Sequence, residues 1–162
     1  MHNQLSVVII SKNEEKFIAD AVKSALFADE VLVLDSGSID DTCVIAQQLG
    51  ARVLHQDWLG FGAQKNKAVE LAKNDWVFVL DSDERITLEL QSEILSTLKN
   101  PTTDGYHVAR LNKFFGKNIR HCGLYPDYSI RLFNRQRGRF NDVSVHESVQ
   151  IQGKTDKLKN HM

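Results

Sequence analysis

Two carboxylates that stand one residue apart have the clearest chemical meaning in this sequence. Asp81 and Asp83 flank Ser82 and follow an apolar run at residues 76–80. Carboxylates at this spacing can both reach a hard cation or its bound waters, and Mg²⁺ or Mn²⁺ combines a few carboxylates with phosphate oxygens of a substrate. Such a cation would neutralise a diphosphate leaving group. The alternative is structural, because acidic residues here would also suit the start of a helix near Thr87.

Three more polar clusters follow the strands that come before this one along the chain. They contain Ser11, Asn13 and Glu14, then Asp35, Gly37 and Ser38, and finally Lys65. In open α/β sheets, ligands bind beyond the carboxyl ends of the strands. One polar strand end means little, but four on the same edge of a sheet indicate a binding site.

Asp35 is the second candidate for ligand binding. Its carboxylate could accept a hydrogen bond from a base N–H or a ribose hydroxyl, and Gly37 permits a tight turn with close backbone approach. The structural alternative is a turn that leads into the helix opening at Asp40. Lys65 lies near the start of a helix, where backbone N–H groups favour phosphate, although it could equally lie on a solvated helical face.

The elements that must position these residues alternate between strand and helix. Apolar runs predict strands over residues 5–10, 30–35, 51–55 and 75–80, and helical periodicity predicts helices over 17–26, 40–49, 63–73 and 87–99. After Pro101, residues 106–110 and 128–133 look like strands with little helix between them. The fold class is therefore α/β, with a doubly wound, mostly parallel sheet that turns mixed in the C-terminal third.

Composition is that of one ordinary globular domain. The 162 residues are 42% hydrophobic and 25% charged, and the two cysteines form no CxxC motif. No basic and apolar leader opens the chain, and no apolar run approaches the ~20 residues that span a bilayer. We therefore expect a cytoplasmic protein.

Charge is distributed unevenly between the two parts of the chain. Residues 1–105 hold 9 Lys and Arg against 17 Asp and Glu, whereas residues 106–162 hold 11 against 4. The basic part could face a phosphate-bearing acceptor or the cytoplasmic face of the inner membrane, or the two parts could simply be solvated faces. Nucleic acid is not expected, because the basic residues are scattered and no nucleic-acid motif accompanies them.

These motifs together resemble the family 2 glycosyltransferases, which have the GT-A fold. Within that family the chain is similar to the lipopolysaccharide core β-1,4-glucosyltransferases. The resemblance covers nearly the whole chain. The segments that carry it are residues 11–15, 35–38, 41–42, 60–65, 81–85, 125–128, 131–133 and 145–147.

The resemblance implies roles for particular residues. Glu147 is the implied general base, with Asp127 as runner-up, and Asp81 with Asp83 would hold the metal and diphosphate. For Glu147 a surface ion pair is the structural alternative, and His146 could position the diphosphate, position the metal or simply pack. The residues assigned to donor binding are Ser11, Asn13, Glu14, Asp35, Gly37, Ser38, Lys65, Asp81 and Ser82.

The implied reaction is inverting transfer of a hexose, glucose in the first place, from a UDP-sugar. The acceptor would be an inner-core heptose of lipopolysaccharide or lipooligosaccharide, or a related glycan, and Mg²⁺ or Mn²⁺ would be the cofactor. A phosphotransferase of the haloacid dehalogenase type also uses Asp-x-Asp, but its nucleophile follows the first strand, where this chain has Ser11.

The resemblance also divides the chain. Residues 1–100 would form the nucleotide-sugar-binding half of a single GT-A domain, and residues 101–162 the acceptor-side half. Family members usually continue well past the His146-Glu147 segment, and no terminating element is evident at residues 159–162. We therefore expect a C-terminally truncated domain, and the alternative function is an inactive sugar-nucleotide-binding domain.

Overall fold

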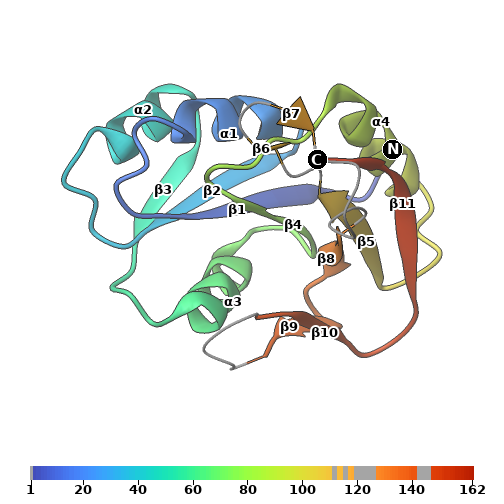
Figure 1. Ribbon diagram of the computed structural model, residues 1–162. Coiled ribbons are helices and arrows are strands. Elements are labelled where there is room, and N and C mark those ends of the chain that lie inside the picture. The colour runs from blue at the N-terminus through green and yellow to red at the C-terminus, as the bar shows by residue number, and fades with distance from the viewer. Residues whose placement is uncertain (1, 111–112, 115–116, 119–126, 142–146) are drawn as a thin grey trace.

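The structure is a computed structural model that describes residues 2–110, 113–114, 117–118, 127–141 and 147–162. A seven-stranded sheet runs through it in the order β11-β5-β8-β4-β1-β2-β3 (Figure 1). Its strands, in that order, are β11 (Thr155–His161), β5 (Gly105–Arg110), β8 (Asp127–Asn134), β4 (Trp76–Asp81), β1 (Leu5–Ser11), β2 (Glu30–Asp35) and β3 (Arg52–His55). Two small hairpins accompany the sheet, β6 (Lys113–Phe114) with β7 (Lys117–Asn118) and β9 (Gly138–Phe140) with β10 (Val149–Ile151).

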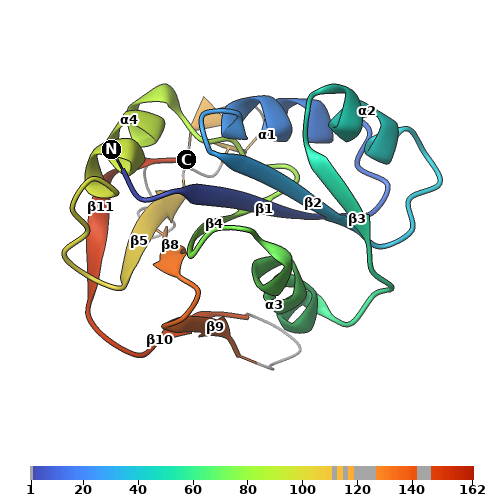
Figure 2. The ribbon, with the colours of Figure 1, turned by 180° about the vertical axis from the view of Figure 1, so that it is seen from behind.

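Helices cover both faces of this sheet, as the sequence predicts. Three of them, α1 (Ile18–Ala25), α2 (Thr42–Gln48) and α4 (Leu88–Thr97), lie on one face, and α3 (Phe61–Leu71) lies on the other (Figure 2). The central strands β1, β2 and β4 supply both cores because successive side chains point to opposite faces. In β1, Val7 and Ile9 belong to the cluster that contains α1 and α4, and Val8 belongs to the cluster that contains α3.

The N-terminal strands are parallel, and the sheet becomes mixed where the sequence predicts it. β4, β1, β2 and β3 run in one direction, and β8 pairs antiparallel with both β4 and β5. This confirms the predicted fold class and the strand and helix order through residue 134. Helix boundaries differ from the predicted ones by up to about two residues, as expected where helix ends fray.

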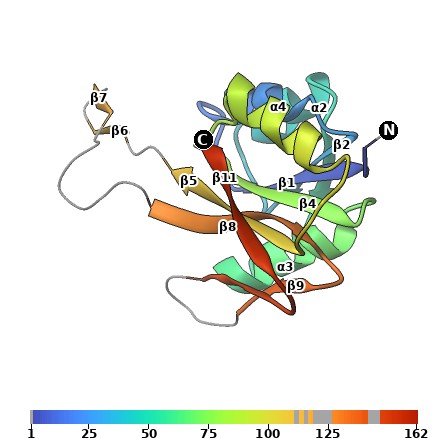
Figure 3. The same ribbon diagram turned by 90° about the vertical axis from the view of Figure 1, so that its right-hand side faces the viewer.

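One strand of the seven-stranded sheet was not predicted from the sequence. β11 pairs parallel with β5 at the edge of the sheet and includes residues 159–161, where the sequence shows no evident element (Figure 3). Its sequence is mostly polar, and only Leu158 is buried. An edge strand needs little apolar pattern, and its lysines discourage pairing with another chain. Hydrophobic periodicity therefore could not find it.

The parallel register brings the predicted clusters to one edge. Ser11 aligns with Asp35 across β1 and β2, and Ile10 aligns with Asp81 across β1 and β4. The carboxyl ends of three adjacent strands therefore meet within about one residue of each other. Among the described helices, none combines the length and apolar character that crossing a membrane requires.

Candidate active site

A cavity of about 500 Å³ lies beyond the carboxyl ends of β1 and β4. Side chains from both strand ends, from the β3–α3 loop, from α3 and from the C-terminal segment surround it. Seven residues predicted for the site line this cavity, namely Ser11, Glu14, Lys65, Asp81, Ser82, Asp83 and Glu147. The structure thus brings together residues that are more than 130 positions apart in the sequence.

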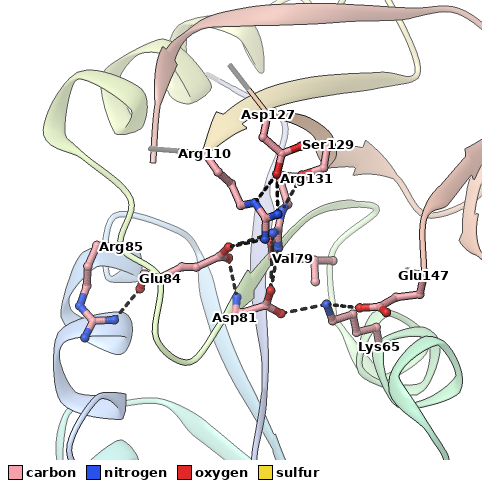
Figure 4. Close-up of polar contacts among 10 residues, drawn as sticks. All are labelled: Lys65, Val79, Asp81, Glu84, Arg85, Arg110, Asp127, Ser129, Arg131 and Glu147. Carbon is pink, nitrogen blue, oxygen red and sulfur yellow. Dashed lines mark hydrogen bonds and ion pairs between the residues drawn. The ribbon is translucent and has the colours of Figure 1, made fainter. Parts of the chain in front are cut away.

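Lys65 connects the two most important carboxylates of the cavity. Its Nζ lies 2.9 Å from Asp81 Oδ1 and 2.8 Å from Glu147 Oε1 (Figure 4). The Lys65 side chain is only 7% exposed, so both ion pairs are shielded from water. Lys65 is therefore not on a solvated helical face, which was the structural alternative for it.

Asp81 is held from its other side by an arginine of β8. Arg131 Nη1 lies 3.4 Å from Asp81 Oδ2, and Arg131 Nη2 lies 2.9 Å from Glu84 Oε1. Glu84 in turn accepts a hydrogen bond from the backbone N–H of Asp81 at 3.0 Å. Arg110 extends the network, contacting Glu84 and donating to Asp127. Charges therefore alternate continuously from Glu147 to Asp127.

Three carboxyl groups of this network, those of Asp81, Glu84 and Glu147, have pKa values shifted from their ordinary ones. Burial raises the pKa of Asp81, but the charges of Arg131 and Lys65 outweigh burial and lower it overall. For Glu147, burial is likewise outweighed by the hydrogen bond and charge of Lys65, so its pKa is lowered. Burial, aided by the Asp81 charge, keeps the pKa of Glu84 raised despite Arg131. Asp81 and Glu147 are therefore ionised at neutral pH.

The acidic residues after β4 do not cap the next helix. The N-cap of α4 is Thr87, whose hydroxyl accepts a hydrogen bond from the backbone N–H of Leu90. Asp81 instead turns to Lys65 and Arg131. The structural alternative, in which the carboxylates of Asp81 and Asp83 suit the start of the next helix, therefore does not describe this fold.

The Asp81 and Asp83 carboxylates fit a hard divalent cation. Asp83 is exposed at the cavity, and its carboxylate has no hydrogen bond or ion pair within the described part of the chain. Asp81 lies beside it but is shared with two cationic side chains. Two carboxylates supply part of the oxygen ligands of such an ion, which would take its remaining ligands from water and phosphate. Among the described residues, no cluster of three or more metal-binding side chains forms a complete site.

Asp35 closes its own turn instead of facing the cavity. Its Oδ2 accepts hydrogen bonds from the backbone N–H groups of Gly37 and Ser38, and its Oδ1 accepts from the hydroxyls of Ser11 and Ser38. Burial raises the pKa of Asp35, but these hydrogen bonds outweigh it and the pKa is lowered. Gly37 has φ +89°, a conformation that favours glycine. Contact between Asp35 and a base stays a prediction.

Asn13 and Ser38 join the two loops that flank Asp35. The backbone N–H of Asn13, which has φ +56°, donates to Ser38 Oγ at 2.7 Å, and the N–H of Ile39 donates to Asn13 Oδ1 at 2.9 Å. Neither side chain lines the cavity. Their assigned donor contacts remain predictions, and what the structure shows is that they connect the loops after β1 and β2.

The two candidates for the general base occupy different places. Glu147 lines the cavity beyond β1 and β4 and also a second cavity of about 410 Å³ on the β8 side. Asp127 lines neither of these cavities and pairs with Arg110. Lys65 and Asp81 share the boundary between the cavities with Glu147. Geometry therefore favours Glu147, and His146 lies outside the described residues.

Several residues of the site were not predicted. Arg131 is buried within β8, where its charge interrupts an apolar strand, and that interruption was a usable signal. Gln64 is fully buried and donates to Ser36 Oγ and to the carbonyl of Gln56, so it anchors the β3–α3 loop. Trp58 and Phe61 line the cavity as exposed aromatic side chains. Nothing in their local sequence distinguishes them from loop residues.

Comparison with known proteins agrees with the site. A mostly parallel sheet with helices on both faces and a cavity beyond its strand ends is the arrangement of a doubly wound α/β protein, in which ligands bind at that edge of the sheet. The profile of glycosyl transferase family 2 matches residues 6–153, which is most of the chain. The chain belongs to this family.

Individual relatives sharpen that assignment. An uncharacterized glycosyltransferase of Rickettsia felis is 36% identical over 153 residues, covering 90% of this chain and 54% of the relative. The lipopolysaccharide core biosynthesis glycosyltransferase LpsC of Rhizobium meliloti is 30% identical over 157 residues, covering 92% and 58%. The chain thus spans about half the length of the curated relatives it matches.

Solved structures share the GT-A fold. S. aureus TarS 1–349 superposes with a TM-score of 0.63 at 20% identity, covering 82% of this chain and 47% of that one. Glucosyl-3-phosphoglycerate synthase from Mycobacterium tuberculosis, in complex with Mn²⁺, UDP and glucosyl-3-phosphoglycerate, superposes with a TM-score of 0.54 at 27% identity. That match covers 64% of this chain and 43% of the synthase.

Proposed function

We propose that this chain is the donor-binding domain of an inverting glycosyltransferase that takes a hexose from a UDP-sugar. The observation that carries the proposal is the Lys65 bridge between Asp81 and Glu147 at the boundary of two cavities. One cavity would hold the donor and the other would admit the acceptor. Glu147 alone among the acidic candidates for the base faces both.

In the proposed reaction, Glu147 acts as the general base. Its ionised carboxylate takes the proton of an acceptor hydroxyl as that oxygen attacks the anomeric carbon from the face opposite the diphosphate. The bond from the anomeric carbon to the diphosphate oxygen breaks, and its electron pair leaves with UDP. Lys65 lies where it can approach the diphosphate while it orients Glu147. The result is inversion at the anomeric carbon.

Asp81 and Asp83 would hold Mg²⁺ or Mn²⁺ in this reaction. A bound divalent ion supplies charge neutralisation for the leaving diphosphate. Asp83 is the freer of the two carboxylates, whereas Lys65 and Arg131 fix the orientation of Asp81. The Mn²⁺ and UDP in the complex of the mycobacterial synthase support this choice of cofactor and donor.

The finer assignment is glucose as the sugar and an inner-core heptose of lipopolysaccharide, or a related glycan, as the acceptor. The 30% identity to LpsC, a lipopolysaccharide core biosynthesis glycosyltransferase, supports it. The basic character of residues 106–162 is consistent with an acceptor that carries anionic groups, or with peripheral contact at an anionic membrane from a cytoplasmic position.

The general base can be tested by donor turnover. UDP release from UDP-glucose is measured with Mn²⁺ for the wild type, Glu147→Gln and Asp127→Asn. We expect Glu147→Gln to lower the rate about 100- to 10,000-fold and Asp127→Asn to lower it much less. Equal rates for Glu147→Gln and the wild type would remove Glu147 from the mechanism. No turnover in the wild type, together with intact UDP binding, would favour the alternative of an inactive sugar-nucleotide-binding domain.

Donor and metal are tested together by calorimetry. UDP is titrated into the protein with Mn²⁺, with Mg²⁺ and after chelation by EDTA. We expect binding that weakens on chelation, and an Asp83→Asn variant whose affinity no longer responds to the metal. Absent UDP binding, or binding of the same strength without metal, would contradict the proposal.

A further inference from the structure

The hairpin of β9 and β10 lies against one face of α3 (Figure 2). Gly62, Lys65 and Asn66 are three and four residues apart on this helix, so they share a face. Each of them lies next to the hairpin or to a residue that flanks its strands. Only Lys65 has a part in the proposed reaction, so the contacts of the other two need their own explanation.

Asn66 binds the backbone of β9 on the side away from β10. Its Nδ2 donates to the carbonyl of Phe140 at 3.0 Å, and its Oδ1 accepts from the backbone N–H of Phe140 at 2.9 Å. A carboxamide presents a donor and an acceptor side by side, so it can pair with both polar groups of one backbone residue, as a neighbouring strand would. These two bonds join α3 to β9 across 74 positions of the chain.

Gly62 allows the chain that follows β9 to approach α3 closely. A Cβ added at Gly62 would lie 2.5 Å from the carbonyl oxygen of Asn141, which is too close for atoms that are not bonded, and 3.7 Å from the Cβ of Glu147. A side chain at residue 62 would therefore displace the backbone at Asn141. Glycine is a poor helix former, and this close approach explains its place within α3.

Asn141 in turn holds the residue that follows Glu147. The backbone N–H of Asn141 donates to the carbonyl of Ser148 at 3.0 Å, and its Nδ2 donates to Ser148 Oγ at 3.0 Å. Asn141 Oδ1 also accepts from the N–H of Ser148 at 3.1 Å. The backbone next to Glu147 is therefore set by α3 through the hairpin. Its carboxylate is set by the same helix through Lys65, whose Nζ lies 2.8 Å away.

We propose that Gly62 and Asn66 are positioning residues, which hold the β9–β10 hairpin against α3 so that the Glu147 carboxylate stands at the boundary of the two cavities. This inference rests on the proposed function, in which Glu147 is the general base. A base must lie within hydrogen-bond distance of the proton that it takes, and a misplacement of about 1 Å can cost about 100-fold in rate. Asp81 extends from β4 and does not depend on the hairpin for its place, so donor binding should survive a shift that impairs turnover.

Turnover and donor binding, measured side by side, test this role. UDP release from UDP-glucose with Mn²⁺ and the Kd of UDP by calorimetry are compared for the wild type, Asn66→Ala and Gly62→Ala. We expect both variants to lower kcat about 10- to 100-fold and to change the Kd of UDP less than about twofold. If urea denaturation shows that Asn66→Ala does not fold, Gly62→Ala still decides the matter, because alanine favours the helix.

Asn160→Ala is the matched control. Its side chain also joins a strand to a helix, since Asn160 Nδ2 of β11 donates to Glu93 Oε2 of α4 at 2.8 Å, but it lies at the edge of the sheet away from α3. This variant should keep the wild-type kcat. A fall in kcat as large as that of Asn66→Ala would show that any lost anchor has this effect, and it would overturn the proposal.

A double-mutant cycle separates positioning of the base from a general effect on the cavity. Asn66→Ala is combined with Glu147→Gln, in which the proposed base is already removed. The added substitution should lower the residual rate less than about twofold if Asn66 acts through Glu147. A further fall as large as that seen in the wild-type background would show that Asn66 acts elsewhere, and it would refute the inference.

The outcomes distinguish this inference from the function on which it rests. Wild-type kcat in Asn66→Ala and Gly62→Ala, together with a slow Glu147→Gln variant, would refute the positioning role and leave the base intact. A loss of UDP affinity that matches the loss of turnover would place the effect on the donor and also refute the role. Glu147→Gln at the wild-type rate, or no turnover by the wild type, would instead contradict the proposed function.

Discussion

Two aspartates of this chain share the same local sequence and have different surroundings. Asp35 ends β2 within Leu34-Asp35-Ser36, and Asp81 ends β4 within Leu80-Asp81-Ser82. Both strands pair in parallel with β1, on opposite sides of it. Asp35 is 3% exposed and hydrogen-bonded to residues of its own loop and of β1. The Asp81 side chain is 28% exposed and paired with Lys65 and Arg131.

The difference shows how the same strand end becomes either a structural or a chemical feature. Asp35 is satisfied mainly by Gly37 and Ser38, which follow it within three residues. Asp81 is satisfied by Lys65 and Arg131, which lie 16 and 50 positions away and arrive from α3 and β8. A carboxylate with distant, cationic partners at a cavity stays partly exposed there and can meet a ligand. A carboxylate that caps its own turn does not.

The largest effect is expected at Asp81. We predict that Asp81→Asn lowers UDP release from UDP-glucose about 100- to 1,000-fold. The substitution removes a negative charge that would hold the divalent cation at the diphosphate. The free energy of unfolding should fall by about 3 kcal/mol or less, because the ion pairs of Asp81 are largely buried but Lys65 keeps Glu147 and Arg131 keeps Glu84 as partners. Turnover assays and urea denaturation measure the two quantities. An Asp81→Asn variant with wild-type activity would contradict a chemical role for Asp81 and remove its contrast with Asp35.

The next effect is expected at Asp35, and it should appear in stability. Asp35→Ala removes the acceptor of four hydrogen bonds and leaves the N–H groups of Gly37 and Ser38 unpaired. We predict a loss of about 2–3 kcal/mol in the free energy of unfolding, measured by urea denaturation. A variant of wild-type stability that no longer binds UDP would instead make Asp35 the nucleotide ligand that the sequence predicts.

A smaller effect is expected at the turn itself. Gly37→Ala should cost about 1–2 kcal/mol of stability, because φ is +89° and an added Cβ would meet only His55, at an ordinary 3.7 Å. Gly50→Ala is the matched control, since Gly50 has φ +94° with open space around it and lies after α2. Equal losses of stability in both variants, with UDP affinity unchanged in Gly50→Ala, would show that the loss comes from backbone strain at positive φ. A Gly37→Ala variant of wild-type stability would contradict the structural role of this turn.

The smallest effect is a dependence on pH. The pKa of Asp35 is lowered in the folded protein from its ordinary value of 3.8, so its ionised form stabilises the fold above that value. This contribution should be lost as pH falls through the folded-state pKa. Urea denaturation of the wild type and Asp35→Asn should therefore give a constant difference near neutral pH that shrinks below about pH 4. A difference that grows with acid would have the wrong sign and would reject this account of Asp35.

Much of the fold could be predicted because its signals are local. The apolar runs of β1, β2 and β4 predict strands buried on both faces, and apolar residues at helical spacing predict α1 and α4. β11 could not be predicted in the same way, because an edge strand with one buried residue has no periodic apolar pattern. Its place was decided by pairing with β5, which is a long-range contact.

In the candidate site, too, local features were predictable and long-range contacts were not. The acidic strand end at Asp81, the basic residue Lys65 and the carboxylate Glu147 were predictable from residue type, position and family resemblance. Their bridge was not, because it requires α3 and the C-terminal segment to meet over the end of β4. Arg131 and Gln64 were missed for a similar reason, since a buried polar residue has meaning only through the partners that satisfy it.

By itself, the sequence determined that a parallel sheet would bring several polar strand ends to one edge. That follows from backbone geometry, because side chains alternate along a strand and strand–helix–strand connections make neighbouring strands parallel. Only the tertiary structure decided which aspartate would face a cavity and which would close a turn. Leu-Asp-Ser occurs at both positions, and a carboxylate takes its role from the charges and N–H groups that the fold brings within hydrogen-bond distance.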